Sequence, residues 1–149
     1  MEHPQSIEAA VVAYLSAITP SPWSEDLTND NGDLRIFAGA NNLDKDGTRI
    51  VVYCDGDLTE APPFSGNRWA DIVVELKTPV VDDGGASLAY YETNAAALKD
   101  AIMADDLVDQ LNTAGGIYFY QIIERNPYRE QDENSWTSGF RLRAYSIQT

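Results

Sequence analysis

The segment Gly66-Asn67-Arg68-Trp69-Ala70-Asp71-Ile72-Val73-Val74-Glu75-Leu76-Lys77-Thr78-Pro79 decides the fold. It opens with a Gly-Asn turn signal and closes with Pro79, which cannot donate a hydrogen bond to a sheet. Between these ends the side chains alternate, which is typical of a strand with one buried face. The apolar set is Ala70, Ile72, Val74 and Leu76, and the opposite set is Asp71, Val73, Glu75 and Lys77. We expect this strand to be the centre of the scaffold and its apolar face to seat the two helices.

The N-terminal half predicts one helix and two strands before this segment. Ser6 is a suitable N-cap, apolar residues follow it at spacings of three and four up to Ile18, and Pro20 stops the helix. Residues 34–38 form a short strand candidate. Residues 49–54 form a second strand, which is rich in β-branched residues.

The C-terminal half predicts a helix and a hairpin. The helix begins near Tyr90, and Asp105-Asp106 either interrupts it or caps a short continuation through Leu111. Residues 117–123 read as a buried strand, and the polar run 124–135, which contains Pro127, reads as a flexible hairpin arm. In the last strand, Phe140, Leu142 and Ala144 face one way and Arg141, Arg143 and Tyr145 face the other.

These elements predict an α+β fold, in which a mostly antiparallel β-sheet is packed by two α-helices, with long loops and a C-terminal hairpin arm. The 149 residues are the length of one domain, so we expect a single domain over 1–149. No run approaches the roughly 20 apolar residues of a membrane helix. Residues Met1 to Pro4 lack the basic and apolar regions of a signal peptide, so we expect a soluble protein made in the cytoplasm.

The net charge of −14 is unevenly distributed. Residues 24–60 carry nine acids and three bases, residues 82–109 carry seven acids and one base, and residues 124–143 carry four of each. So acidic a surface repels phosphate backbones, which argues against autonomous nucleic-acid binding. An acidic body with a locally basic C-terminal hairpin can associate with copies of itself, hairpin to body. The alternative is a solvated charged loop.

Two kinds of site are suggested only weakly by the sequence. Asn42-x-Asp44-x-Asp46-Gly47 has the ligand spacing of a calcium loop, but its twelfth position is Tyr53 instead of a glutamate. A turn explains this segment better. The single histidine, His3, lies near a terminus, and the single cysteine, Cys54, ends an apolar run. Neither is placed for nucleophilic catalysis, and Cys54 is expected to be a small buried hydrophobe.

Glu75 and Lys77 raise the possibility of a nuclease. With Asp55 or Asp57 upstream, Glu75-Leu76-Lys77 on a strand resembles the signature of PD-(D/E)xK nucleases, which bind Mg²⁺ through the acidic pair. Residues two apart on a strand share a face, as this signature requires. The upstream acids, however, lie in a turn that a Pro-Pro segment separates from the strand, and the chain lacks a basic surface for DNA. A polar strand face without a chemical role explains Glu75 and Lys77 better.

The order and hydrophobic pattern of residues 49–149 resemble a family of tailed-phage structural proteins, the tail terminator (tail completion) and neck-associated proteins. The matching stretches are the strand 49–54, Gly66-Asn67-Arg68-Trp69 leading into 72–76, Asp82-Asp83, the helix with Leu98 and Ile102, Asp105-Asp106-Leu107 with Leu111, the strand 117–123, and a polar arm leading into Ser135-Trp136 and the strand 140–145.

The resemblance implies a subunit of a ring, usually hexameric, that caps the head-proximal end of the tail tube and joins it to the head. The implied partners are further copies of the chain, the tail tube protein and the head–tail connector or neck protein, with DNA only as passing cargo. It also implies a place in the virion at the head–tail junction after synthesis in the host cytoplasm, and no catalytic residue, metal or cofactor.

Within this interpretation the expected interface residues lie in the C-terminal hairpin. They are Arg125, Arg129, Trp136, Arg141 and Arg143. Trp136 is equally explained as a core residue at the start of a strand. The alternatives that remain open are a head-completion or neck protein of similar fold, the divalent-metal nuclease that would use Glu75 and Lys77, and a generic acidic interaction module.

Overall fold

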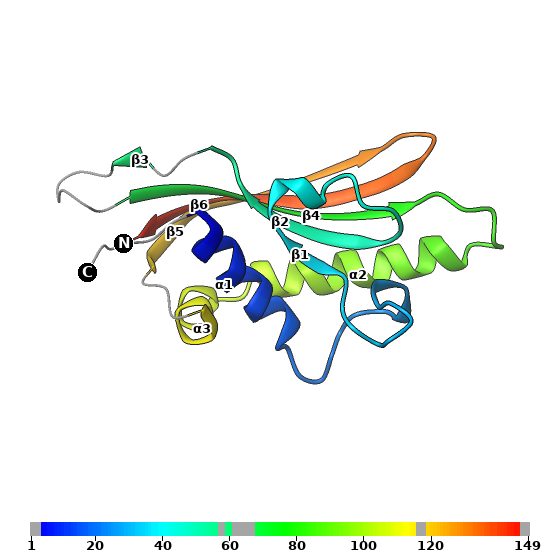
Figure 1. Cartoon of the computed structure of the whole chain (residues 1–149), viewed down its shortest axis with the longest axis horizontal. Coiled ribbons are helices and arrows are strands. Elements are labelled where there is room, and N and C mark those ends of the chain that lie inside the picture. The colour runs from blue at the N-terminus through cyan, green and yellow to red at the C-terminus, as the bar shows by residue number, and fades with distance from the viewer. Residues whose placement is uncertain (1–3, 57–58, 61–67, 116–118, 147–149) are drawn as a thin grey trace.

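The computed structural model in Figure 1 describes residues 4–56, 59–60, 68–115 and 119–146. They form a six-stranded sheet in the order β1-β2-β4-β6-β5, with the short β3 paired to β4 outside this path. β1 and β2 pair in parallel, and the other named strand pairs are antiparallel. The strands are β1 (Ile36–Ala38), β2 (Arg49–Cys54), β3 (Thr59–Glu60), β4 (Arg68–Pro79), β5 (Phe119–Gln131) and β6 (Ser135–Ser146). The helices are α1 (Pro4–Ser16), α2 (Ala86–Ile102) and α3 (Leu107–Gly115), with 3-10 turns η1 (Glu25–Leu27) and η2 (Ala40–Asn42).

β4 lies at the centre of the sheet, because β2 and β3 pair with one of its edges and β6 with the other. It pairs with β6 over its full length, from Arg68 opposite Ser146 to Pro79 opposite Ser135. The apolar face predicted from its alternation is confirmed, since no member of that set is more than 1% exposed. The strand also ends at Pro79, as predicted. Gly66 and Asn67 lie outside the described residues.

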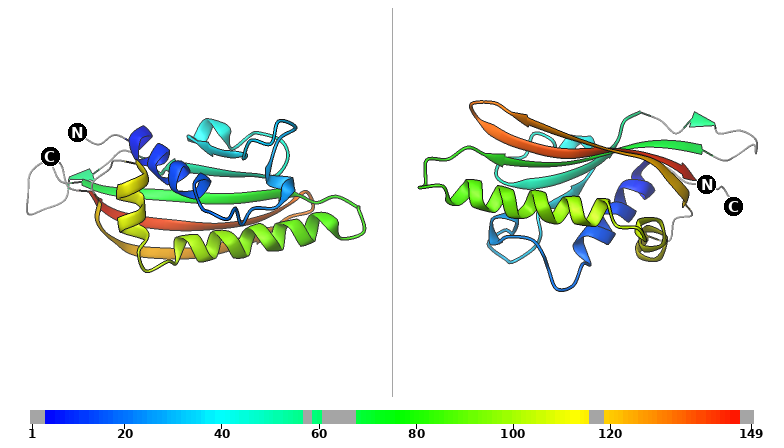
Figure 2. Two further views of the ribbon diagram at one scale, coloured as in Figure 1. Left: turned by 90° about the horizontal axis from the view of Figure 1, so that it is seen from below. Right: turned by 180° about the vertical axis from the view of Figure 1, so that it is seen from behind.

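All three described helices pack on the apolar face of the sheet (Figures 1 and 2). α2 runs lengthwise along the sheet. α1 and α3 lie beside each other near the end of the sheet towards which α2 runs. None of the helices in the described part of the chain combines the length and the apolar character needed to span a bilayer. The α+β fold with a mostly antiparallel sheet is therefore as predicted, with three helices in place of two.

The third helix results from the interruption at Asp105-Asp106, which is one of the two outcomes that the sequence left open. α2 ends at Ile102, and α3 begins at Leu107. α2 also begins earlier than Tyr90. The carboxylate of Asp83 accepts hydrogen bonds from the Ser87 backbone N–H at 3.0 and 3.1 Å and from the Ser87 hydroxyl at 3.2 Å. A carboxylate in this position satisfies donors that a helix N-terminus leaves free.

The core lies between the helices and the sheet. Tyr14 of α1 donates its hydroxyl proton to the Ala101 carbonyl of α2 at 2.8 Å, so the two helices are joined by a polar contact inside it. Full burial of one large aliphatic side chain is worth about 1.5–3 kcal/mol. The largest fully buried side chains of this core are Ile7, Leu15, Leu27, Ile50, Ile72, Leu76, Leu98, Ile102, Leu107, Leu111 and Val11.

The hairpin differs from the prediction in two ways. The polar run 124–135 is regular strand as far as Gln131, with pairing to β6 that includes Gln131 opposite Trp136. Pro127 is tolerated because β5 is the edge strand of the sheet. The run is therefore not a flexible arm, and only its turn departs from the ladder, where the Asp132 carboxylate accepts the N–H groups of Asn134 and Ser135 at 2.7 Å.

The second difference concerns the expected buried strand at 117–123. Ile117 and Tyr118 lie outside the described residues. Tyr120 and Ile123 are 64% and 44% exposed, so the prediction of burial was wrong for both. The register shifts at these two positions, and a residue in a bulge is left out of the regular alternation of the ladder. Phe119 is buried, as predicted.

Candidate functional site: the open face of the sheet

The side chains of β4, β5 and β6 that point away from the helices form what we call the open face. Residues directly opposite each other in an antiparallel pair share a face, so the register assigns its members. Among the described residues, no helix covers these three strands on this side of the sheet. The short η2 lies on the same side, over β1 and β2 (Figure 1). The central members of the open face are Trp69, Asp71, Val73, Glu75 and Lys77 of β4, and Thr137, Gly139, Arg141, Arg143 and Tyr145 of β6.

Tyr128 bridges three strands on this face. It stands on β5 opposite Gly139 of β6, which in turn stands opposite Glu75 of β4. The Tyr128 hydroxyl reaches across β6 and donates a hydrogen bond to the Glu75 carboxylate at 3.0 Å. A Cβ atom at position 139 would lie 2.6 Å from Cζ and Oη of the Tyr128 ring. Glycine is therefore the residue that leaves room for the ring to cross the middle strand.

The electrostatics of this bridge favour the neutral phenol. Burial raises the pKa of Tyr128, and the negative charge of Glu75 and the hydrogen bond to it raise that pKa further. The guanidinium of Arg141 stands 4.9 Å from the centre of the Tyr128 ring and acts in the opposite direction. A phenol that keeps its proton stays a donor to Glu75, so the bridge is a structural contact at neutral pH.

We expect the stability of the fold to decline at alkaline pH, in part through Tyr128. Its pKa in the folded state lies above the value near 10 of an unfolded chain, so above about pH 10 the unfolded state releases the proton first. The stabilisation that the protonated Tyr128 hydroxyl provides is thus present below about pH 10 and is lost as the pH rises further. Urea midpoints at neutral and alkaline pH measure this, and Tyr128→Phe should show a smaller decline than the wild type. An equal decline in both would contradict the assignment, since other groups with raised pKa values would then account for it. These groups are Tyr14, Tyr53, Tyr90 and Cys54.

A second group, which we call the aromatic row, lies where β4 begins and β6 ends. Trp69 packs edge-to-face on Tyr145, with 5.0 Å between ring centroids and 72° between planes. Tyr120 packs on the other side of Tyr145 at 6.0 Å. The guanidinium of Arg143 stands 5.2 Å from the centre of the Trp69 ring. The aromatic row therefore consists of Tyr120, Tyr145, Trp69 and Arg143 in continuous contact.

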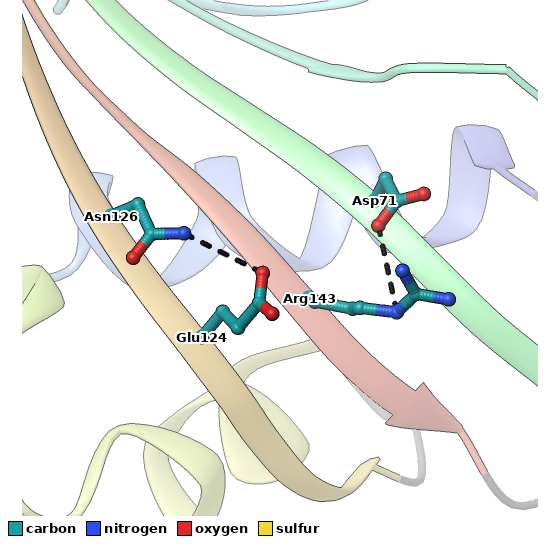
Figure 3. A network of polar contacts seen from close by, with 4 residues as sticks. All are labelled: Asp71, Glu124, Asn126 and Arg143. Carbon is teal, nitrogen blue, oxygen red and sulfur yellow. Dashed lines mark hydrogen bonds and ion pairs between the residues drawn. The ribbon is translucent and has the colours of Figure 1, made fainter.

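The polar groups beside the aromatic row are only loosely engaged with one another (Figure 3). Arg143 Nε lies 4.0 Å from the Asp71 carboxylate, and both side chains are substantially exposed. Asn126 donates to Glu124 at a long 3.5 Å. An exposed ion pair of this length contributes about 0–1 kcal/mol. Replacing such contacts with contacts to a partner protein therefore costs little free energy. A shallow depression of about 190 Å³ lies between Asp71, Glu124 and Asn126.

The predicted interface residues divide between the two faces of the hairpin. Arg141 and Arg143 stand on the open face, each over an aromatic ring. The other three stand on the helix side. Arg129 is exposed, with its guanidinium 5.5 Å from the Tyr91 ring centre. Trp136 stacks on Tyr91 at 5.8 Å and 25° and packs against the core, as its alternative interpretation required.

Arg125 has a structural role that the sequence did not suggest. Its guanidinium donates to the backbone carbonyls of Ile102 and Ala104 at 3.0 and 2.8 Å, just where α2 ends. Cations are favourable at a helix C-terminus, where carbonyls lack partners. We expect Arg125→Met to reduce the free energy of unfolding by about 1–2 kcal/mol, measured by urea denaturation. Arg129→Met is the control on the same side of β5, and a loss as large there would contradict the capping role.

Of the two acidic pairs that the nuclease signature allows, the structure describes Asp55 with Glu75, and it does not bring these two together. Glu75 and Lys77 share the open face, as predicted, but Asp55 pairs its backbone N–H with the Asp71 carbonyl at 2.8 Å. Asp71 and Glu75 are four residues apart on one strand, which is about 13 Å. Asp57 lies outside the described residues. Within the ranges that are described, no group of three His, Cys, Asp or Glu side chains is placed to hold a metal ion.

The segment with calcium-loop spacing is held by two arginines. Arg35 donates to the Asp46 carbonyl, and Arg49 donates to the carbonyls of Leu43 and Gly47, both at 2.8 Å. Arg49 is buried, and among the described residues its Nε has no hydrogen-bond partner. These cations occupy carbonyl oxygens of the loop, so the loop is a turn before β2, as the sequence suggested.

Cys54 is partly buried and packs against the core, in line with its expected role. Burial, and then the charge of Glu8, raises the pKa of its thiol to about 12. The thiol therefore stays protonated at neutral pH and is a poor nucleophile. His3 lies outside the described residues.

Sequence patterns reveal only part of the open face. The alternation of the last strand places Arg141, Arg143 and Tyr145 on one face. The Tyr128 bridge is not visible in that alternation, because Tyr128 lies in a run that reads as a polar loop. Tyr120 stands in a bulge, where a strict period of two assigns no side. The signal that could have indicated the bridge is Gly139, because a glycine inside a strand often marks a close approach.

No protein-family model matches this chain, and no curated protein matches it. Its function is therefore inferred from the geometry of the open face and from the resemblance in sequence pattern.

Proposed function

We propose that this protein is a structural subunit of a tailed phage, a tail terminator that forms a ring on the head-proximal end of the tail tube. The observation that carries the proposal is the open face, a sheet surface without a helical layer in the described residues that presents aromatic rings and arginines. Tyrosine, tryptophan and arginine are the residues most enriched at the energetic centres of protein interfaces. Such a surface suits contact with another protein.

The charge of the molecule supports the same proposal. A net charge of −14 disfavours binding to DNA, and a ring through which DNA passes must not hold its cargo. In a ring, one patch of each subunit meets a different patch of the next, so the faces of the subunit must differ. They do so here, since helices cover one face of the sheet and stacked arginines and aromatic rings occupy the other.

The proposed partners are other copies of the chain, the tail tube protein, and the connector or neck protein of the head. A head-completion or neck protein of similar fold would use the same kind of surface and differ only in lacking affinity for the tube. The nuclease has no support from the described geometry, because Asp55 and Glu75 are not adjacent. A location in the virion belongs to this proposal and would follow from binding to the tube.

The test measures mass and partner binding together. Size-exclusion chromatography with light scattering should give a closed oligomer whose mass does not grow with concentration. Co-sedimentation with purified tail tubes should deplete the protein from the supernatant, and tubes already capped by their own terminator are the matched control. A strict monomer that ignores tubes would refute the proposal. A ring that binds only connectors would favour the neck protein.

A parallel assay tests the nuclease directly. Linear and circular DNA incubated with the protein and Mg²⁺ should remain intact. Glu75→Gln provides the control, since the substitution removes the carboxylate that the nuclease signature requires while it keeps a hydrogen-bond acceptor for Tyr128. Cleavage by the wild type that is lost in Glu75→Gln would overturn the proposed function.

A further inference from the structure

The exposed large hydrophobic side chains of the described residues belong to the segments near the two ends of α2 and to the first half of β5. One group lies before and at the start of this helix, and the other lies at its end and on the first half of β5. α2 has 17 residues, which corresponds to about 25 Å. The first group is Val80, Val81 and Leu88, and the second is Met103, Tyr120 and Ile123.

Val80 and Val81 of the first group belong to a projection that we call the acidic tip, made of residues 80–83 and 132–134. Its two loops are joined by a hydrogen bond from the Val80 N–H to the Asn134 carbonyl at 2.9 Å, and both lie at one end of the molecule (Figure 1). Val81 is 53% exposed at this end. The tip contains four acids and no base, and all four are exposed. They are Asp82, Asp83, Asp132 and Glu133.

Of the second group, Tyr120 belongs to the aromatic row. Tyr120 is 64% exposed and forms the outer end of that row, and Arg143 stacks on Trp69 within it. The row and the acidic tip lie at opposite ends of β6, since Tyr145 and Ser135 mark its two ends. Ten residues of strand separate them by about 30 Å. One copy therefore carries both surfaces without bringing them into contact.

The two surfaces are complementary in chemistry. The tip offers small branched apolar side chains surrounded by carboxylates, and the row offers aromatic rings with a guanidinium. We propose that the acidic tip of one copy of this chain docks on the aromatic row of the next copy, with Val81 and Asp82 against Tyr120 and Arg143. The inference rests on the proposed ring and names its contact. Because the two patches differ, the contact is heterologous, and it closes a ring when the rotation between copies permits.

The aromatic row also resembles a stacking platform for single-stranded nucleic acid. Such platforms lie in positively charged grooves that follow the phosphate backbone. Here Asp71 and Glu124 stand beside the row, and the whole chain is acidic. A nucleic acid strand would bring successive phosphates past a single guanidinium with these carboxylates beside it, whereas the tip needs only the Asp82 carboxylate to reach Arg143. The observations therefore favour the tip.

The experiment uses a tip variant and a row variant of the full chain. The tip variant is Val81→Lys with Asp82→Lys, and its control, Asp30→Lys with Asn31→Lys in an exposed turn, changes the net charge equally. The row variant is Tyr120→Glu with Arg143→Gln, and its control is Thr93→Glu with Lys99→Gln on the exposed side of α2. Circular dichroism and thermal unfolding check that all four retain the fold. Asp83 is left intact because it caps α2.

Light scattering and sedimentation velocity then give the masses. We expect the controls to assemble like the wild type and each variant alone to be monomeric, with affinity between copies reduced about tenfold or more. An equimolar mixture of the two variants should form particles of two chains and nothing larger, because one intact tip remains for one intact row. This mixing result distinguishes a heterologous contact from a symmetric one.

Three outcomes would overturn the inference. If both variants retain the wild-type mass, the ring uses another surface and the proposed function survives. If the mixture remains monomeric at the highest attainable concentration, the tip and the row are not partners. If a labelled single-stranded DNA oligonucleotide binds the wild type but not the row variant, the row is a nucleic-acid platform. A wild type that is itself monomeric and ignores tail tubes would refute the proposed function together with the inference.

Discussion

Gly139→Ala should destabilise the protein by about 2–4 kcal/mol, a large effect for the addition of one methyl group. The new Cβ would lie 2.6 Å from the ring of Tyr128, and the ring cannot shift without breaking its hydrogen bond to Glu75. Overpacking typically costs about 1–3 kcal/mol, and a hydrogen bond to a charged group contributes about 1.5–3 kcal/mol, of which solvent exposure here retains only a part. Urea denaturation at neutral pH measures the change.

A double-mutant cycle separates the clash from other effects of alanine at this position. In a Tyr128→Ala background the ring is absent, so Gly139→Ala should be nearly neutral, and alanine is a slightly better strand residue than glycine. The coupling energy between the two positions should therefore account for most of the loss. Equal destabilisation in both backgrounds would show that glycine is required at position 139 for another reason.

Asn94→Ala should cost about 2–4 kcal/mol, although Asn94 lies in the middle of a helix where alanine is intrinsically preferred. The Asn94 side chain is fully buried, and its amide forms two contacts with one residue. Its Oδ1 accepts the Ser24 N–H at 2.8 Å, and its Nδ2 donates to the Ser24 hydroxyl at 2.9 Å. Each group that loses its partner costs about 1–3 kcal/mol. The contacts attach the segment that follows α1 to α2.

Thr93→Ala is the matched control, because its side chain is exposed on the same turn of α2 and its change should fall within about 0.5 kcal/mol. Thermal unfolding monitored by tryptophan fluorescence is an informative second readout, since Trp23 lies beside Ser24 and donates to the Leu15 carbonyl at 3.0 Å. If Asn94→Ala and Thr93→Ala were equally mild, the buried amide would contribute little to holding this segment.

The fold could be predicted wherever one face of an element is buried and the other is not. β4 has this property, so its alternation located both its apolar face and its end at Pro79. β5 lacks it, because an edge strand that exposes most of its residues has the composition of a loop, and the run from Glu124 onward reads as one. The start of α2 is misplaced because Asp83, whose carboxylate accepts the Ser87 N–H, lies in what reads as a turn.

The candidate site was less predictable than the fold, because it depends on pairs of residues distant in sequence. Tyr128 reaches Glu75 only through the register of three strands, and no local pattern encodes that register. Arg141 and Arg143 were found because alternation within one strand is local. The expectation that Arg125 is an interface residue rests on its charge and its place in the hairpin, whereas its contacts are with the end of α2.

The central pairing of the sheet constrains the order in which the molecule can form. β4 has β6 as its partner on one side, so residues 68–79 wait for residues 135–146 before that edge is satisfied. Contacts between such distant segments slow folding, and a chain made from its N-terminus supplies β6 after the other named strands. A nascent chain thus exposes one unpaired edge of β4 until residues 135–146 have been made. Products truncated before β6 should be prone to aggregation, because such an edge is a template for pairing with another chain.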